Sequence, residues 1–292
     1  DRIENIKKSS LPVTLLLNCF TIRGNLFRTK REEIEMDYAL PNISNDLSGR
    51  VALVTGTTSG LGRRFAEVIA ASGAKVVVTG RRIDRLEALA KEIQDKGGVA
   101  EPIQLDMQSN DSIMNCVEKA EASLGTIDIL VNNAGIPDAQ RAHKMSLELI
   151  DSVFDTNLRG PYVLSCEIAR RLIASEKPGR MVNISSVGGF SYAGNGAALY
   201  SITKSAIVRM TECLAVEWAR YNINVNAIAP GAFASEMMDG MLERMGDISQ
   251  HFPRKRICDP AQMDSTLLYF LSPASEAVTG TYIKIDDGQG GR

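Results

Sequence analysis

Hydrophobic positions recur in two alternating patterns along most of the chain. Short runs rich in Val, Ile and Leu that end at glycine are typical of buried strands, whereas apolar residues three or four apart are typical of helices. Runs of the first kind predict strands at residues 50–56, 74–80, 100–106, 127–135, 179–186, 223–231 and 280–288. The segments between them predict helices at residues 63–73, 83–98, 109–125, 147–175, 199–221 and 259–273. Hydrophobic strands that alternate strictly with helices predict a parallel sheet covered by helices on both faces.

The alternation extends over residues 47–292 without an internal repeat or a low-complexity linker. We therefore predict an α/β fold, with a Rossmann-type doubly wound parallel sheet of about seven strands. The chain has 292 residues, of which 44% are hydrophobic and 23% charged, as is typical of a globular protein. Residues 47–292 are expected to form a single domain, which at this size can bury a core without disulfides or metals.

The first 46 residues do not share this pattern and are expected to form an N-terminal extension that is partly disordered. Residues 11–20 are apolar, but this run is far shorter than the ~20 residues that a membrane-spanning helix needs. No secretory cleavage site is evident. Met36 is a candidate start of the protein, and residues 1–35 are interpreted as an upstream extension. A peripheral membrane contact or an organelle-targeting role for residues 1–35 is the alternative.

Charge and cysteine content argue against several classes of function. The formal net charge of −2 and the isoelectric point near 5.9 indicate no basic surface for nucleic acid. The cysteines are odd in number and widely scattered, at Cys19, Cys116, Cys166, Cys213 and Cys258. This favours reduced thiols in a cytoplasmic protein over disulfides or a zinc site. His143 and His251 have no partners at metal-ligand spacing, so no metal site is predicted.

A glycine-rich segment joins the first predicted strand to the first predicted helix. Gly56, Gly60 and Gly62 have the spacing G-x-x-x-G-x-G rather than the commoner G-x-G-x-x-G. Glycines allow a tight turn and a close approach of the backbone to a phosphate, and a helix N-terminus offers unpaired N–H groups to the anion. The position of this loop predicts a dinucleotide-binding site.

The end of the second predicted strand bears on the choice of dinucleotide. An acidic residue there would bind the adenosine ribose of NAD, but this strand is followed by Arg81 and Arg82. Two guanidinium groups suit a ribose 2′-phosphate, so NADP is preferred over NAD. The alternative is that both arginines are only solvated charges at the start of a helix. Asp106 closes the third strand, where it is expected to bond the adenine amino group.

Tyr200 and Lys204 are four residues apart in a predicted helix, so their side chains share one face. Such a pair is usually no more than two helix neighbours. A free phenol has a pKa of about 10, and an adjacent ammonium favours the phenolate and lowers that pKa. With a dinucleotide site upstream, the pair is therefore a candidate acid–base device for the proton that accompanies hydride transfer.

Six motifs occur in an order and at spacings that resemble a known family. They are TGTTSGLG at residues 55–62, NNAG at 132–135, DTNLRG at 155–160, NISS at 183–186, YSITK at 200–204 and APG at 229–231. Together they make residues 47–292 similar to the short-chain dehydrogenase/reductases in their compact single-domain form. The resemblance implies an NAD(P)-dependent oxidoreductase that transfers a hydride between the cofactor and a ketone or secondary alcohol.

The resemblance also implies roles for individual residues. Tyr200 corresponds to the acid–base of the family, Lys204 to its partner and Asn157 to the relay asparagine, which holds a water. Ser186 corresponds to the hydroxyl that orients the substrate, although its spacing to Tyr200 leaves Ser185 as an alternative. The expected cofactor contacts are Gly56, Thr58, Ser59, Gly60, Leu61, Gly62, Arg81, Arg82, Asp106, Met107, Asn133, Ala134, Gly135, Tyr200, Lys204, Pro230, Gly231 and Phe233.

Residues 232–258 are expected to form a lid over the substrate. Ser235 is a weak match to a threonine that contacts the nicotinamide amide in the family. The methionines of this segment indicate an adaptable apolar wall. Its basic run, residues 253–256, would meet an acidic carrier protein or lie in solvent.

The resemblance leaves the substrate open. The members most similar in appearance are 3-oxoacyl carrier-protein reductases and dehydrogenases of ketones or sugar alcohols. A non-enzymatic, NADP-binding sensor on the same fold is an alternative, and a lyase or epimerase is another. The family further implies a homotetramer that pairs the long helices after the fourth and fifth strands and the C-terminal strands.

Overall fold

The computed structural model describes residues 38–192, 194 and 196–290. The predictions for residues 1–35, including Cys19, therefore concern residues outside the described ranges. The compact unit that carries the sheet runs from Asn42 to Arg292, so it begins before the expected boundary at residue 47. Leu47 is buried in this unit, and its N–H group donates to the carbonyl oxygen of Ser72 at 2.8 Å. The division into one extension and one domain stays a prediction.

Seven parallel strands form the sheet in the described part of the chain, as the alternation predicted. The strands are β1 Val51–Thr55, β2 Lys75–Gly80, β3 Val99–Gln104, β4 Ile129–Asn132, β5 Gly179–Ile184, β6 Ile223–Pro230 and β7 Tyr282–Ile285. Their spatial order is β3-β2-β1-β4-β5-β6-β7, so the order reverses at β1. In such sheets ligands bind outside the carboxyl ends of the strands, at the point of reversal.

Helices connect the strands. They are α1 Gly60–Ala71, α2 Ile83–Asp95, α3 Asn110–Leu124, α4 Leu147–Phe154, α5 Gly160–Ala174, α6 Ala198–Trp218, α7 Glu236–Met245 and α8 Asp264–Leu271. Short 3-10 turns lie at Ala142–Lys144, Val187–Gly189, Ala219–Tyr221, Ile248–His251, Pro260–Met263 and Pro273–Ser275. The single helix expected at residues 147–175 is instead divided by a π-helical turn, Asp155–Arg159, between α4 and α5.

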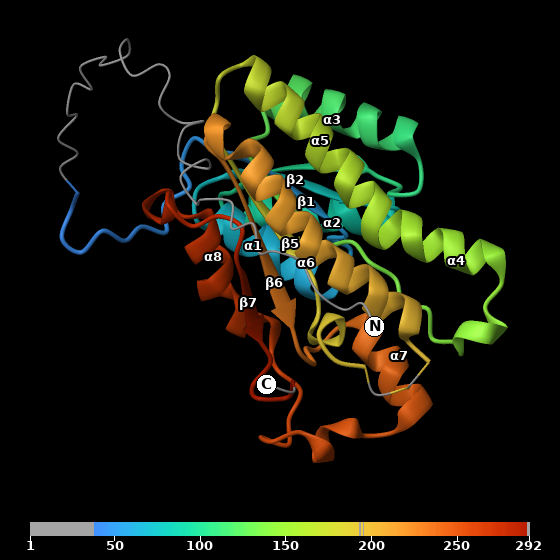
Figure 1. Cartoon of the computed structure of the whole chain (residues 1–292). Coiled ribbons are helices and arrows are strands. Elements are labelled where there is room, and N and C mark those ends of the chain that lie inside the picture. The colour runs from blue at the N-terminus through green and yellow to red at the C-terminus, as the bar shows by residue number, and fades with distance from the viewer. Residues whose placement is uncertain (1–37, 193, 195, 291–292) are drawn as a thin grey trace, which may run out of the picture. The chain divides into compact units, whose positions relative to one another are not determined.

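The two faces of the sheet are covered by different helices (Figure 1). Alternate residues of β1 point to opposite faces, with Ala52 and Val54 in one buried cluster and Val51 and Leu53 in the other. Helices α1, α2 and α8 pack on the first face, and α3, α5 and α6 pack on the second. This double coverage explains why the strands are nearly continuous hydrophobic runs.

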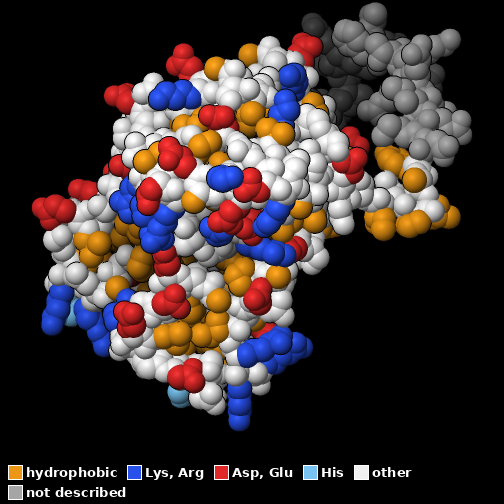
Figure 2. All heavy atoms as spheres, turned by 180° about the vertical axis from the view of Figure 1, so that it is seen from behind, with side chains coloured by type: hydrophobic (Ala, Val, Ile, Leu, Met, Phe, Trp, Pro, Cys, Tyr) orange, Lys and Arg blue, Asp and Glu red, His pale blue; other side chains and the backbone are white. Residues whose placement is uncertain are grey.

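Several features of the described residues bear on the function classes. No helix within them is long and apolar enough to cross a membrane. They contain no group of three or more His, Cys, Asp or Glu side chains that could hold a metal ion. The cysteines within them are free thiols, namely Cys116, Cys166, Cys213 and Cys258. On the face shown in Figure 2, basic and acidic side chains are interspersed, so neither sign of charge dominates it.

Candidate active site

The glycine loop between β1 and α1 turns tightly onto the start of the helix. Gly56 and Gly60 have φ angles of +71° and +55°, which residues with side chains rarely adopt. A Cβ atom on Gly62 would overlap the carbonyl oxygen of Gly56. Ser59, the N-cap of α1, makes no side-chain cap bond, and the first turn holds no acidic residue. The N–H groups of this turn, which includes the partly buried Leu61, are therefore available to an anion.

The end of β4 is tied to this loop. Asn133 donates from Nδ2 to the carbonyl oxygens of Thr55 and Gly56, at 3.0 and 3.2 Å. The backbone N–H groups of Asn133 and Ala134 both donate to the hydroxyl of Thr55 at 3.0 Å. A Cβ atom on Gly56 would lie 2.9 Å from the Cα atom of Ala134. The structure therefore brings the NNAG segment and the glycine loop together, as the predicted cofactor site requires.

The arginines after β2 lie at the start of α2, beside the glycine loop. Arg82 donates from Nη2 to the hydroxyl of Thr58 at 2.6 Å and to the carboxylate of Glu236 at 3.0 Å. Arg81 is exposed, and Gln104 donates to its carbonyl oxygen at 2.9 Å. Arg82 is thus held by partners from two other segments. This arrangement argues against the alternative that Arg82 is only a solvated charge at the start of a helix.

Asp106 and Met107 follow β3 at the same edge of the sheet. Asp106 accepts an N–H bond from Gln108 at its Oδ1 atom, at 3.0 Å. Met107 is buried, and a Cβ atom on Gly160 would lie 2.5 Å from its carbonyl oxygen. Gly160 therefore allows the start of α5 to pack closely on this turn. The bond from Asp106 to an adenine amino group stays a prediction.

Tyr200 and Lys204 lie one turn apart on α6. The Nζ atom of Lys204 is 5.6 Å from the centre of the Tyr200 ring and donates to the carbonyl oxygen of Ile184 at 2.7 Å. Only 4% of Lys204 is exposed, and burial lowers its pKa to about 8. The ammonium group therefore exchanges its proton at a pH close to neutral.

The two serines after β5 have different partners. Ser185 is buried, and its hydroxyl donates to the carbonyl oxygen of Lys204 at 2.7 Å. The hydroxyl of Ser186 is hydrogen-bonded to the phenol of Tyr200 and accepts the N–H bond of Gly188 at 3.1 Å. The structure thus brings Ser186 rather than Ser185 beside Tyr200.

The pKa of Tyr200 differs from the expectation. Burial raises this pKa above its ordinary value, the hydrogen bond with Ser186 lowers it by less, and the carboxylate of Asp138 raises it further. The ammonium of Lys204 is engaged by the carbonyl of Ile184 and does not offset the loss of hydration. The prediction that this ammonium lowers the pKa of the phenol is therefore wrong for this structure.

Asn157 lies in the π-helical turn between α4 and α5 and is 1% exposed. Its side-chain amide pairs with the backbone of Ile136, accepting an N–H bond at 2.8 Å and donating to the carbonyl oxygen at 2.9 Å. Nδ2 also donates to the hydroxyl of Thr203 on α6 at 3.3 Å. A Cβ atom on Gly135 would lie 3.4 Å from both the Oδ1 atom of Asn157 and the Nζ atom of Lys204. The relay residues therefore flank one glycine.

The segment after β6 is held by the C-terminal tail. The expected cofactor contacts in it are Pro230, Gly231 and Phe233. The side-chain oxygen of Gln289 accepts the N–H bond of Ala232 at 2.6 Å, and a Cβ atom on Gly231 would lie 2.5 Å from that oxygen. Sequence reasoning does not single out Gln289, because its partner lies 57 residues away in the chain.

Ser235 has a different role from the expected one. It is the N-cap of α7, and its hydroxyl accepts the N–H bond of Met238 at 3.2 Å. A Cβ atom on Gly60 would lie 2.9 Å from the Cβ atom of Ser235, so the start of α7 packs on the glycine loop. This position favours a helix cap over a contact with the nicotinamide amide.

Asp138 is a further residue that the sequence does not single out. It is 3% exposed, and its Oδ2 atom accepts the N–H bonds of Leu199 and Tyr200 at 2.8 and 3.2 Å. It thus caps the start of α6, the helix that carries Tyr200 and Lys204. The sequence signal is no more than an acidic residue shortly after the NNAG motif.

The comparison with known proteins identifies the family. The family model described as short chain dehydrogenase matches residues 50–245. The chain belongs to the short-chain dehydrogenase family. The 3-oxoacyl-(acyl-carrier-protein) reductase FabG of Aquifex aeolicus is 37% identical to it over 245 residues, which are 83% of this chain and 98% of that protein. The predicted family and the predicted fold are thereby confirmed.

Solved structures of other short-chain dehydrogenases share the fold. A putative NAD(P) dependent gluconate 5-dehydrogenase from Beutenbergia cavernae, with bound NADP, is 34% identical with a TM-score of 0.78, covering 85% of this chain and 99% of that one. The 3-ketoacyl-(acyl-carrier-protein) reductase from Brucella melitensis, complexed with NADH, is 30% identical with a TM-score of 0.76, covering 84% and 99%. These likenesses support a nicotinamide cofactor.

This short-chain dehydrogenase is therefore an oxidoreductase that acts on CH–OH or C=O groups. Its own residues fit a nicotinamide dinucleotide. The glycine loop leaves a cradle that a Cβ atom on Gly62 would fill, and the first turn of α1 has no acidic residue to repel a phosphate. The relatives are reductases and dehydrogenases, which favours an enzyme over a sensor, a lyase or an epimerase.

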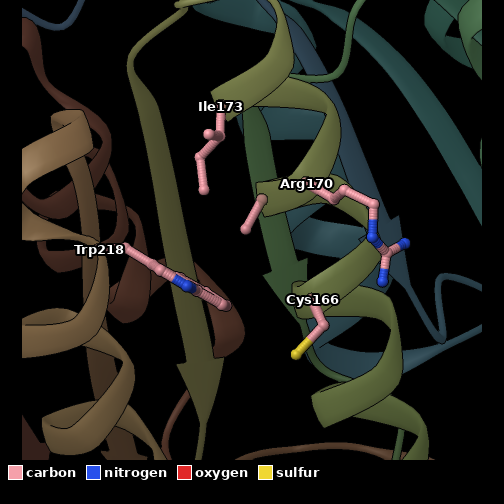
Figure 3. Close-up of a pocket in the computed structure, with 5 residues that line it drawn as sticks. Cys166, Arg170, Ile173 and Trp218 are labelled. Carbon is pink, nitrogen blue, oxygen red and sulfur yellow. The ribbon is translucent and has the colours of Figure 1, made fainter.

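A hollow elsewhere on the short-chain dehydrogenase is separate from this site. It lies between α5 and α6 and is lined by Cys166, Ala169, Arg170, Ile173 and Trp218. Figure 3 shows the indole of Trp218 reaching from α6 toward α5. None of the expected substrate or cofactor residues lines this hollow. The hollow is therefore not part of the candidate active site described above.

Proposed function

We propose that the enzyme transfers a hydride between NADP(H) and a ketone or secondary alcohol, with Tyr200 as the acid–base. The observation that supports this most directly is the meeting of Tyr200, Ser186 and Lys204 beyond the end of β5. When bound, the nicotinamide cofactor supplies or accepts the hydride. The protein orients the reactants and moves the proton.

In the direction of reduction, Tyr200 donates its proton to the carbonyl oxygen as negative charge develops there. The raised pKa keeps the phenol protonated at neutral pH, which suits this direction. The hydroxyl of Ser186 lies within hydrogen-bond distance of the phenol, so a substrate oxygen that meets the phenol also meets this hydroxyl, which turns its proton from the phenol to that oxygen and orients it. In the direction of oxidation the phenolate has to form, which the raised pKa of Tyr200 disfavours in this structure.

The proton that Tyr200 loses is replaced through Lys204. Its pKa of about 8 allows proton exchange close to neutral pH. Asn157 supports this relay by shaping the space beside Gly135, since its Oδ1 atom and the Nζ atom of Lys204 lie equally close to that glycine. The water that Asn157 is expected to hold belongs to this proposal.

NADP is the proposed cofactor because of the cationic groups beside the glycine loop. Arg81, Arg82 and the hydroxyl of Thr58 lie next to the end of β2, where the adenosine ribose of a dinucleotide binds in this fold. A ribose 2′-phosphate is the ligand chemistry that guanidinium groups recognise best.

A carrier-linked 3-oxoacyl thioester is the second candidate substrate, because the Aquifex relative is a carrier-protein reductase. The basic run 253–256 is partly neutralised within the chain itself. Arg254 and Arg256 both pair with Asp287, at 2.9 and 2.7 Å. This weakens the expectation that the run meets an acidic carrier, so we place free small-molecule carbonyls and alcohols first.

We also propose a homotetramer in the cytoplasm. The hollow and the exposed apolar residues of α5 and α6 are surfaces that a second copy could cover, among them Tyr162 and Val216, which are 50% and 82% exposed. β7 pairs only with β6 within the described chain, so its other edge is available to a partner strand.

The first test is a calorimetric titration of the protein with NADPH and, separately, with NADH. We expect at least tenfold tighter binding of NADPH, which corresponds to ~1.4 kcal/mol. A preference for NADH would contradict the role of Arg81 and Arg82. Absence of binding by either cofactor would contradict the proposed function as a whole.

The second test is turnover by Tyr200→Phe with free acetoacetyl thioester, carrier-linked thioester and gluconate as substrates. Loss of the acid–base should reduce turnover by about 10²–10⁴-fold, far more than the loss of one hydroxyl changes the affinity for the cofactor. Tyr269→Phe, at an exposed tyrosine on α8, is the matched control. Full turnover by Tyr200→Phe would refute the mechanism, and equal rates with free and carrier-linked thioesters would count against carrier recognition.

A further inference from the structure

Glu236 connects three segments around the glycine loop. It is the first residue of α7, and its carboxylate accepts bonds from Arg82 at 3.0 and 3.4 Å. Arg85, one turn further along α2, pairs with the same carboxylate. The hydroxyl of Ser59 in the glycine loop is also hydrogen-bonded to it. The carboxylate of Glu236 on α7 thus accepts hydrogen bonds from both the glycine loop and α2.

These donors form an anion site that the chain fills with its own side chain. Arg82 and Ser59 are among the groups that we assign to the cofactor, and Arg82 also donates to Thr58. The bonds from Arg82 and Arg85 hold the pKa of Glu236 down at about 2, so its carboxylate is charged at neutral pH, where a cofactor phosphate is charged as well. Glu236 and a cofactor phosphate would therefore compete for the guanidinium group of Arg82.

The carboxylate of Glu236 can move away from Arg82 without any change in the backbone. The side chains of Arg82, Arg85 and Glu236 are each between 41% and 48% exposed, so all three can turn into solvent. The start of α7 is meanwhile held by the Ser235 cap and its close contact with Gly60. A change of side-chain rotamer is therefore sufficient to free Arg82.

We propose that Glu236 is a cofactor-selectivity residue, which competes with the ribose 2′-phosphate of NADP(H) for Arg82. The inference rests on the proposed function, in that Arg82 is taken to bind this phosphate. A cofactor with a 2′-hydroxyl does not need Arg82 and leaves the Glu236 contacts in place. The carboxylate of Glu236 therefore weakens the binding of NADP(H) but not of NAD(H), and so reduces the difference between the two affinities.

The size of the effect follows from exposure. Ion pairs in contact with solvent are weak and screened by salt, so the loss of this competitor should change phosphate affinity by about three- to tenfold rather than by orders of magnitude. The same screening means that the gain should shrink at high ionic strength.

The test is Glu236→Gln, with Asp239→Asn as the matched control. Both changes remove one negative charge from the first turn of α7, but Asp239 is exposed and has no ion pair among the described residues. Calorimetric titrations of the full chain use adenosine 2′,5′-bisphosphate and adenosine 5′-monophosphate. These probes carry the adenosine ends of NADP and NAD without the nicotinamide, so the readout does not depend on turnover.

We expect Glu236→Gln to bind the bisphosphate about three- to tenfold more tightly than the wild type, with unchanged affinity for the monophosphate. Asp239→Asn should match the wild type with both probes. The inference would be overturned if Glu236→Gln gained equally with both probes or bound the bisphosphate more weakly than the wild type does. It would also be overturned if the bisphosphate bound neither the wild type nor Glu236→Gln. If the wild type binds NADPH but Glu236→Gln shows no gain, the inference fails alone; if the wild type binds neither NADPH nor NADH, the proposed function fails with it.

Discussion

Lys204 and Tyr200 share one face of α6, and loss of hydration moves their pKa values in opposite directions. Burial lowers the pKa of Lys204 to about 8 and raises that of Tyr200, because it disfavours the charged form of each group. A neutral phenol is the form that protonates a carbonyl oxygen. At the scale of single residues, the protonated phenol supports the reductive direction of the proposed reaction.

The pKa of Lys204 predicts a pH dependence of stability. Between the folded value of about 8 and the ordinary value of 10.5, the unfolded chain holds more protons than the folded one. The free energy of unfolding should therefore gain a contribution that grows as the pH rises through this window and is absent below it. Lys204→Met lacks this group. In this window the free energy of unfolding of the wild type should therefore rise relative to that of the variant, by up to ~1.4 kcal/mol per pH unit.

Urea unfolding of both proteins between pH 7.5 and 9.5 measures this difference. The range stays below the ordinary pKa of tyrosine, about 10, and burial raises the pKa of Tyr200 further in the folded chain, so the phenol is mostly protonated in both states. Parallel stability curves for the wild type and Lys204→Met would show that the Lys204 ammonium is not disfavoured by burial.

At the scale of elements, two helices place the candidate catalytic residues. The start of α6 is capped from a distance by Asp138, which fixes the turn that holds Tyr200. The π-helical turn between α4 and α5 adds a residue to the helical repeat at Asn157, and its amide thereby reaches the backbone of Ile136. Such turns are frequent at functional sites because they redirect one side chain within a helix.

The cap on α6 leads to a prediction about Asp138. Asp138→Ala removes the acceptor for three backbone N–H groups, two of them at the start of α6, and should lower the free energy of unfolding by about 0.5–2 kcal/mol. Asp138→Asn keeps an acceptor oxygen and should recover most of that loss. It should also shift the pH profile of turnover to lower pH, because the charge of Asp138 raises the pKa of Tyr200.

Urea unfolding and the pH profile are the two measurements for Asp138. Asp111→Ala is the matched control, because Asp111 is an exposed residue in the first turn of α3 that does not cap it. If Asp138→Ala were as stable as the wild type, the cap would have no part in holding α6.

At the scale of the whole molecule, the length of α6 separates the chemistry from the surface proposed for assembly. Tyr200 lies in the first turn of α6, whereas the hollow is lined by Trp218, the last residue of α6, and by residues of α5 (Figure 3). Exposed apolar residues near this hollow, such as Tyr162 and Val216, are costly to leave in water.

The proposed tetramer predicts the effect of a charge on α6. In a symmetric interface, Val216→Lys places a like charge on each copy of the same surface, so it should lower the assembled mass seen by light scattering. Val99→Lys is the control, because Val99 is 46% exposed on β3, the edge strand at the opposite end of the sheet. A wild type that is monomeric at micromolar concentration would contradict the tetramer.

Short-range patterns in the sequence determined most of the architecture. The strands, the helices and the glycine loop depend on periodicity and on backbone freedom within a few residues, as in the positive φ angles of Gly56 and Gly60. The facing of Tyr200 and Lys204 likewise follows from the helical repeat. These features could be predicted because each is decided by residues that are close in the chain.

Tertiary structure alone decided how these parts act on one another. The cap from Asp138 to Leu199 spans 61 residues, and the pair of Arg82 with Glu236 spans 154. The choice of Ser186 over Ser185 depends on which hydroxyl lies beside the phenol of Tyr200 rather than on the backbone of α6, and the raised pKa of Tyr200 depends on segments that exclude water from it. Such contacts and the loss of hydration arise only when distant segments pack, so no local pattern carries them.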